Sequence, residues 1–103
     1  MNDSVEIQNV ERMRRQAGID DVELREQVRL LRVGDVVKLT FLAGPGKSET
    51  LRVRITAIRR PRFTGELATA ASSPQLAALA AGSQVRFTGD HIHSVSADSG
   101  RRG

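Results

Sequence analysis

Residues 36–55, VVKLTFLAGPGKSETLRVRI, decide the fold. Apolar residues alternate with polar ones on both sides of the glycine-containing centre, and the apolar set is Val37, Leu39, Phe41, Leu51, Val53 and Ile55. Successive side chains of a β-strand point to opposite faces, so this period of two is typical of half-buried strands. The stretch therefore predicts two strands joined by a flexible loop at residues 43–49, with the apolar side chains on the inner face.

The loop contains Gly46-Lys47-Ser48, the triplet that ends the phosphate-binding loop of many nucleotide hydrolases. That loop needs another glycine five positions earlier, where this chain has Phe41. It also needs a helix after it, whose N-terminal amides meet the phosphates, whereas a strand is predicted here. Pro45 moreover has no amide hydrogen to donate. We therefore predict a turn and no nucleotide site.

Three more strands are predicted after this hairpin. Ile58 breaks the alternation that would place Ala57 on the inner face, and this indicates a β-bulge. RRPR at residues 59–62 predicts a turn, because proline fixes φ and cannot donate to a ladder. The residues then expected on the inner face of the third and fourth strands are Phe63, Gly65, Leu67, Val85 and Phe87. DHIHSV at residues 90–95 predicts a tight turn into a short last strand.

The first third of the chain predicts two helices. Asp3 and Glu6 resemble a capping box, and Gly18 supplies a stop for the first helix. Its apolar stripe is Ile7, Val10, Met13 and Ala17. The second helix is expected to start at Asp20 or Asp21. Its stripe is Leu24, Val28 and Leu31.

These elements predict an α+β, mostly β fold: a small five-stranded antiparallel SH3-like barrel with two N-terminal helices. A short helical turn is expected before the fourth strand, framed by Ser73, Pro74 and Gly82. The predicted organisation is a helical segment at residues 1–33, a barrel at 34–96 and a disordered tail at 97–103, forming one folding unit.

The chain carries a net charge of +4. Residues 1–34 hold six Arg and seven acids, whereas residues 35–97 hold eight basic residues and four acids, so the excess lies on the strands. Arginine grips phosphate through a planar fork of donors. The candidate anion-binding residues are Arg52, Arg54, Arg59, Arg60, Arg62 and Arg86. Alternation and the predicted hairpin bring the first five to one edge of the barrel, and the partner is a nucleic acid or an acidic protein.

The sequence gives little indication of a metal site, a catalytic site or a membrane span. The chain has no Cys, and its two His residues, His91 and His93, lack the further ligands that a metal site needs. No arrangement of catalytic residues emerges, so we predict a non-enzyme without metal or cofactor. MNDSVEIQNV at residues 1–10 predicts no signal peptide, and no stretch approaches the roughly 20 apolar residues of a membrane span. We expect a cytoplasmic protein that does not bind membranes.

Four segments resemble a bacterial family of small proteins known only as a domain of unknown function. They are GDVVKLTF at 34–41, ETLRVRI at 49–55, FTGEL at 63–67 and GSQVRFTGDHI at 82–92. The resemblance implies an SH3-like barrel without enzyme activity. Arg52 stands where that family usually has Trp, and HSV at residues 93–95 replaces its late aromatic residue.

Two functions follow as the main hypotheses, and a small-molecule or metal site near His91 and His93 is a distant third. The first is a bacterial binding module that contacts nucleic-acid phosphates through the arginine-rich edge. The second is a protein–protein interaction module, an immunity or adaptor protein, that uses the exposed face of the N-terminal helices.

Overall fold

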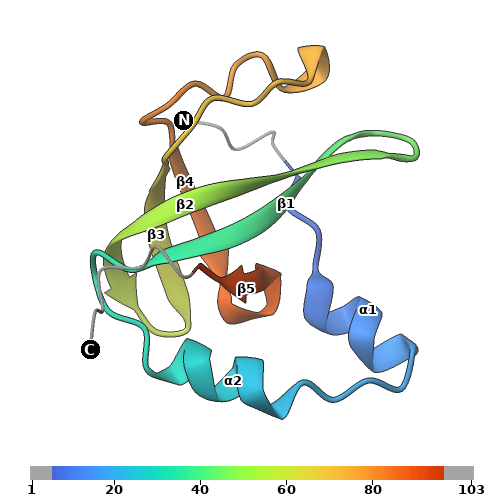
Figure 1. The fold of residues 1–103 in the computed structure, drawn as a ribbon, viewed down its shortest axis with the longest axis vertical. Coiled ribbons are helices and arrows are strands. Elements are labelled where there is room, and N and C mark those ends of the chain that lie inside the picture. The colour runs from blue at the N-terminus through green and yellow to red at the C-terminus, as the bar shows by residue number, and fades with distance from the viewer. Residues whose placement is uncertain (1–5, 97–103) are drawn as a thin grey trace.

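The computed structural model describes residues 6–96. They form a five-stranded antiparallel sheet with the order β4-β3-β2-β1-β5, and two short helices lie along one end of it (Figure 1). The strands are β1 (Val36–Gly44), β2 (Lys47–Arg59), β3 (Arg62–Leu67), β4 (Gln84–Thr88) and β5 (Ile92–Val95). The helices are α1 (Val10–Gln16) and α2 (Val22–Arg29), with 3-10 turns η1 (Pro74–Leu76) and η2 (Gly89–His91).

The alternation in the central hairpin is confirmed. Val37, Leu39 and Phe41 of β1 are 0% exposed, and their cross-strand neighbours on β2 include Val53 and Leu51. The loop between the two strands is a tight connection in which Gly44 and Gly46 have positive φ, and β2 begins at the next residue. A strand and no helix follows the turn, as predicted, but it begins at Lys47 within the GPGKS segment, so the loop is shorter than the predicted residues 43–49.

The predicted bulge is also present. The register between β2 and β3 shifts between Ile55 and Ala57. Ala57 is exposed as a result, and Ile58 packs against the core in its place. The expectation that Ala57 faces inward was therefore wrong, because one extra residue in a strand moves every later side chain to the other face.

The sheet is not closed into a barrel. β4 and β5 are its two edge strands, and no ladder joins them in the described part of the chain. The chain passes from β4 through η2 to β5, which pairs with β1 at the opposite edge. The predicted number of strands, their antiparallel pairing and the helical turn before β4 are confirmed, whereas the closed sheet is not.

The second helix follows its sequence signals, with Asp21 as the N-cap accepting from the Leu24 amide at 3.0 Å. The first helix starts later than predicted. Asn9 caps it, while Ile7 forms an antiparallel bridge with Phe41. β1 pairs with β5 only as far as Leu39, so on that side its backbone groups at Thr40 and Leu42 need other partners, and residues 6–8 supply them. Asp3, the predicted cap, lies outside the described residues.

Glu49 at the base of the β1–β2 loop holds the segment before η1. Its carboxylate accepts hydrogen bonds from the amides of Ser72 and Ser73 and from the Ser72 hydroxyl, at 2.6–3.1 Å. The Ser72 contacts, followed by the Ser73 amide, lower the pKa of Glu49 to about 2, because each favours the ionised form. Leu76 at the end of η1 and Leu79 just after it are buried in the core.

Candidate functional site

Three arginines meet on the outer face of strands β2, β3 and β4. The register places Arg59 opposite Arg62, and it places Arg86 opposite Thr64. Because β3 lies between the other two strands, the three side chains come from adjacent positions on one exposed surface. The bulge near Ala57 sets this register, so the cluster depends on it.

These side chains line a groove of about 560 Å³. Its lining residues are Ala57, Arg59, Arg60, Pro61, Arg62, Phe63, Thr64 and Arg86. Within residues 6–96, no carboxylate lies within ion-pair distance of Arg59, Arg62 or Arg86. We call these three residues the arginine triad, and their groove the basic groove. Their positive charge is not neutralised by neighbouring acids.

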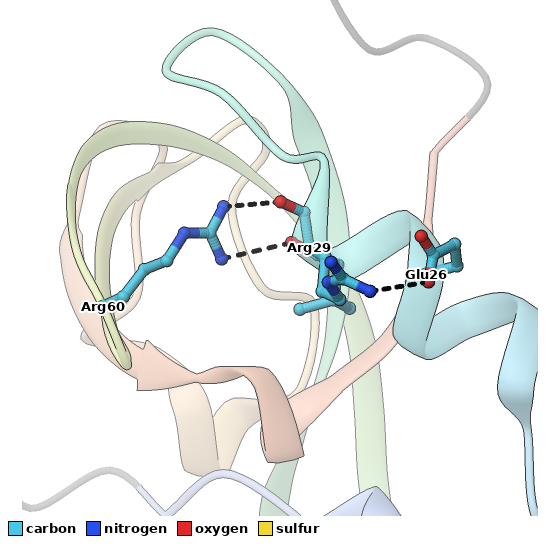
Figure 2. A network of polar contacts seen from close by, with 4 residues as sticks. Glu26, Arg29 and Arg60 are labelled. Carbon is cyan, nitrogen blue, oxygen red and sulfur yellow. Dashed lines mark hydrogen bonds and ion pairs between the residues drawn. The ribbon is translucent and has the colours of Figure 1, made fainter.

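Arg60 also lines the groove, but its guanidinium N–H groups donate hydrogen bonds to backbone carbonyls of the protein. Its guanidinium donates to the carbonyl oxygen of Arg29 at 2.9 Å (Figure 2), and also to those of Leu31 at 3.3 Å and Val28 at 3.4 Å. The last carbonyls of a helix have no partner within the helix, and a cation at this end also complements the helix dipole. Arg60 thus ties the β2–β3 turn to the C-terminus of α2.

Arg52 and Arg54 lie farther along the outer face of β2 and do not line the basic groove. Arg52 stands opposite Lys38 of β1. Arg54 stands opposite Glu66 of β3, and it donates to the Gly34 carbonyl at 3.3 Å. The structure therefore brings together Arg59, Arg62 and Arg86 from the predicted set, with Arg60 beside them, and leaves the other two apart.

A smaller hollow of about 410 Å³ lies next to the basic groove and was not expected from the sequence. Its lining residues are Val28, Arg60, Pro61, Phe63, Thr88, Gly89 and Asp90. Three of them, Arg60, Pro61 and Phe63, also line the basic groove. No sequence pattern connects α2 with the end of β4, so only the tertiary fold reveals this hollow, which we call the side hollow.

His91 and His93 do not act as a pair. The His91 Nδ1 accepts from the Thr88 amide at 3.0 Å, while His93 is exposed beside Ser94. Burial lowers the pKa of His91, and the nearby Asp90 charge opposes this only in part. Across residues 6–96, no group of three or more His, Cys, Asp and Glu side chains is placed to hold a metal ion.

A third hollow, of about 610 Å³, lies between α1, α2 and η2. Apolar side chains, among them Val22, Leu24 and Ile92, line it together with charged ones. Three of the arginines that line it lie within 4.0 Å of a carboxylate: Arg15–Glu11, Arg25–Asp20 and Arg29–Glu26. Glu11 and Glu26 also line the hollow, whereas Asp20 does not. Arg14, which also lines this hollow, donates instead to the His93 carbonyl at 3.2 Å. This region therefore differs from the basic groove in that most of its arginines are paired with acids.

The chain matches no protein-family model, and comparisons with curated proteins and with solved structures give no significant match. The resemblance to the family of unknown function therefore stays a prediction. Neither helix in the described range has the length and the apolar character required to cross a membrane.

Proposed function

We propose that this protein is a non-enzymatic binding module whose basic groove contacts the phosphates of a nucleic-acid strand. The observation that carries the proposal is the arginine triad: three exposed guanidinium groups from three adjacent strands, without a carboxylate partner in residues 6–96. Each guanidinium offers two parallel donors to phosphate oxygens. A groove lined by one sign of charge also attracts its ligand at long range.

The mode of contact follows from where the aromatic residues lie. All three Phe side chains are buried, with Phe41, Phe63 and Phe87 at most 3% exposed. They cannot form the exposed stacking platform that many single-strand binders use. Affinity must then come mainly from the phosphates, and such binding weakens steeply with salt.

An SH3-like arrangement of the strands, in a sheet that stays open, and membership of the family of unknown function belong to the same proposal. Support comes from the strand order β4-β3-β2-β1-β5 and from the 3-10 turn η2 between β4 and β5. The segments that carry the resemblance coincide with β1, β2, β3 and β4.

A matched pair of variants tests the proposed function. Changing Arg59, Arg62 and Arg86 together to Ala should abolish the mobility shift of a short oligonucleotide at about 50 mM salt. The control changes Arg15, Arg25 and Arg29 to Ala, which lowers the net charge by the same three units, from +4 to +1, but removes paired arginines. For the wild type, a single strand that contacts three phosphates should give a salt slope of about 2. Equal losses in both variants would show that only net charge matters and would refute a site at the basic groove.

A protein–protein module is the second candidate, and one observation favours it. All the large, clearly exposed apolar residues of the described chain lie between residues 13 and 33: Met13, Ile19, Val22, Leu30 and Val33. Exposed apolar surface of this kind marks interaction sites when it is contiguous. In a pull-down, a protein partner that still binds the triple Ala variant of the arginine triad but no longer binds Val22→Asp would favour this function over nucleic-acid binding.

A further inference from the structure

The side hollow combines an apolar wall with one carboxylate. Val28 and Pro61 supply the accessible apolar surface, because Phe63 is only 2% exposed, and Asp90 supplies a negative charge. In the described chain Asp90 has no ion-pair partner, and its side chain is exposed. The hollow is therefore suited to a group that combines apolar surface with N–H donors.

Arg60 adds a fixed planar group at the boundary between the hollow and the basic groove. Its guanidinium is held by three carbonyl oxygens, and its central carbon lies 5.6 Å from the centre of the Phe63 ring. Nucleobases stack on guanidinium planes as well as on aromatic rings. In a chain whose Phe side chains are buried, Arg60 can take the place of the missing aromatic platform.

The two hollows also have the right arrangement for a nucleotide. They share Arg60 and Pro61 of the β2–β3 turn, together with Phe63. A phosphate in the basic groove and a group in the side hollow would therefore lie on either side of this turn. In a nucleic-acid strand each phosphate is followed by a base on the same sugar. A single nucleotide can then reach both hollows, provided that its base is unpaired.

We infer that the side hollow receives an unpaired nucleobase, with guanine preferred, from the strand whose phosphates occupy the basic groove. This inference rests on the proposed function. A carboxylate accepts hydrogen bonds through two oxygens. The pairing edge of guanine presents two adjacent N–H donors to it, whereas thymine presents one N–H between two carbonyl oxygens. Asp90 is therefore the residue that sets the base preference.

The test uses short thymidine oligonucleotides that differ only in the central nucleotide, which is guanine, thymine or an abasic site. Fluorescence anisotropy with the full-length chain should give an affinity about tenfold higher for the central guanine than for the abasic site. The salt slope should be the same for all three strands, because their phosphates are identical. Measurement near pH 8 keeps His91, next to Asp90, neutral.

Asp90→Asn provides the matched variant, since the side chain is exposed and the change keeps its size. The guanine preference should disappear, while the affinity for the abasic strand stays the same or rises slightly with the loss of a negative charge. Persistence of the preference in this variant would overturn the assignment of Asp90. Equal affinity of the wild type for all three strands would overturn the side hollow as a base site and leave phosphate binding intact. Absence of binding to every strand at about 50 mM salt would overturn both proposals.

Discussion

The helices and the outer face of the sheet both carry arginine, but the two regions differ in how many of these arginines form ion pairs with carboxylates. Arg15, Arg25 and Arg29 of the helical region each lie 2.7–4.0 Å from a carboxylate. The arginine triad on β2, β3 and β4 has no such partner in residues 6–96. Among the described residues, Arg12 and Arg14 of α1 have no ion pair, so local neutralisation applies to three helical arginines, whereas every arginine of the triad is available to an external anion.

Packing separates the same two regions. The strands bury most of the core, whereas α2 contains no fully buried residue and α1 contains only Val10. The helices nevertheless stay attached, through half-buried Leu24 and Val28 and through the hydrogen bonds from Arg60. This comparison indicates that the sheet supplies the stability and that the helices depend on it.

The largest effect is expected from breaking the sheet core. Leu39→Ala removes a side chain that is 0% exposed and leaves a cavity, so the free energy of unfolding should fall by about 2–5 kcal/mol. Leu30→Ala, just after α2 at a position that is 57% exposed, should change it by no more than about 0.5 kcal/mol. Urea denaturation measures both values, and similar losses would contradict the assignment of stability to the sheet.

A smaller effect is expected from cutting the link between the two regions. Arg60→Ala removes the donors to the carbonyls of Val28, Arg29 and Leu31, at a cost of about 1 kcal/mol. Hydrogen exchange should accelerate mainly in α2. Arg62→Ala, two residues away without these contacts, should leave α2 unchanged, and equal acceleration in both variants would disprove the role of Arg60.

The next effect is local and depends on pH. The pKa of Glu49 is lowered in the folded state to about 2 from 4.5, so its contribution is complete above about pH 4.5 and is lost as the pH falls toward 2. The amide NMR signals of Ser72 and Ser73 should shift over this range as the loop detaches. Glu49→Gln should remove the transition, and a shift that persists in this variant would assign it to another group.

The smallest effect is expected in the helical region. Glu26→Gln breaks an exposed ion pair with Arg29 at 3.2 Å, and such pairs contribute at most about 0.5 kcal/mol, less at high salt. The urea midpoint should barely move. A loss as large as that of Arg60→Ala would show that the paired charges matter more to the helices than we infer.

The sequence predicted the sheet well because strand patterning is local. The alternation at Leu51, Val53 and Ile55 does not depend on distant residues. The bulge could be predicted because Ile58 breaks this local alternation. It predicted the start of α1 poorly. Ile7 fits a helical stripe, but the part of β1 that extends beyond β5 bonds to residues 6–8, and no local pattern shows where β5 ends.

Arg60 and Arg62 show the same limit within the candidate site. The two residues are alike in sequence, and both belong to the predicted set. Only the packed structure shows that one reaches the carbonyls at the end of α2 while the other stays in the basic groove. Asp90 and Val28 could not be joined to this site from sequence, because they are distant in the chain and share no motif with it.

By itself, then, the amino-acid sequence determined where the strands form, most of the side chains that the sheet buries and where the positive charge gathers, since period and composition are properties of neighbouring residues. The tertiary structure alone decided that the sheet stays open, which arginines share a groove and which one supports a helix. Those outcomes depend on strand register and on contacts between distant segments, and each is fixed only when the whole chain has packed.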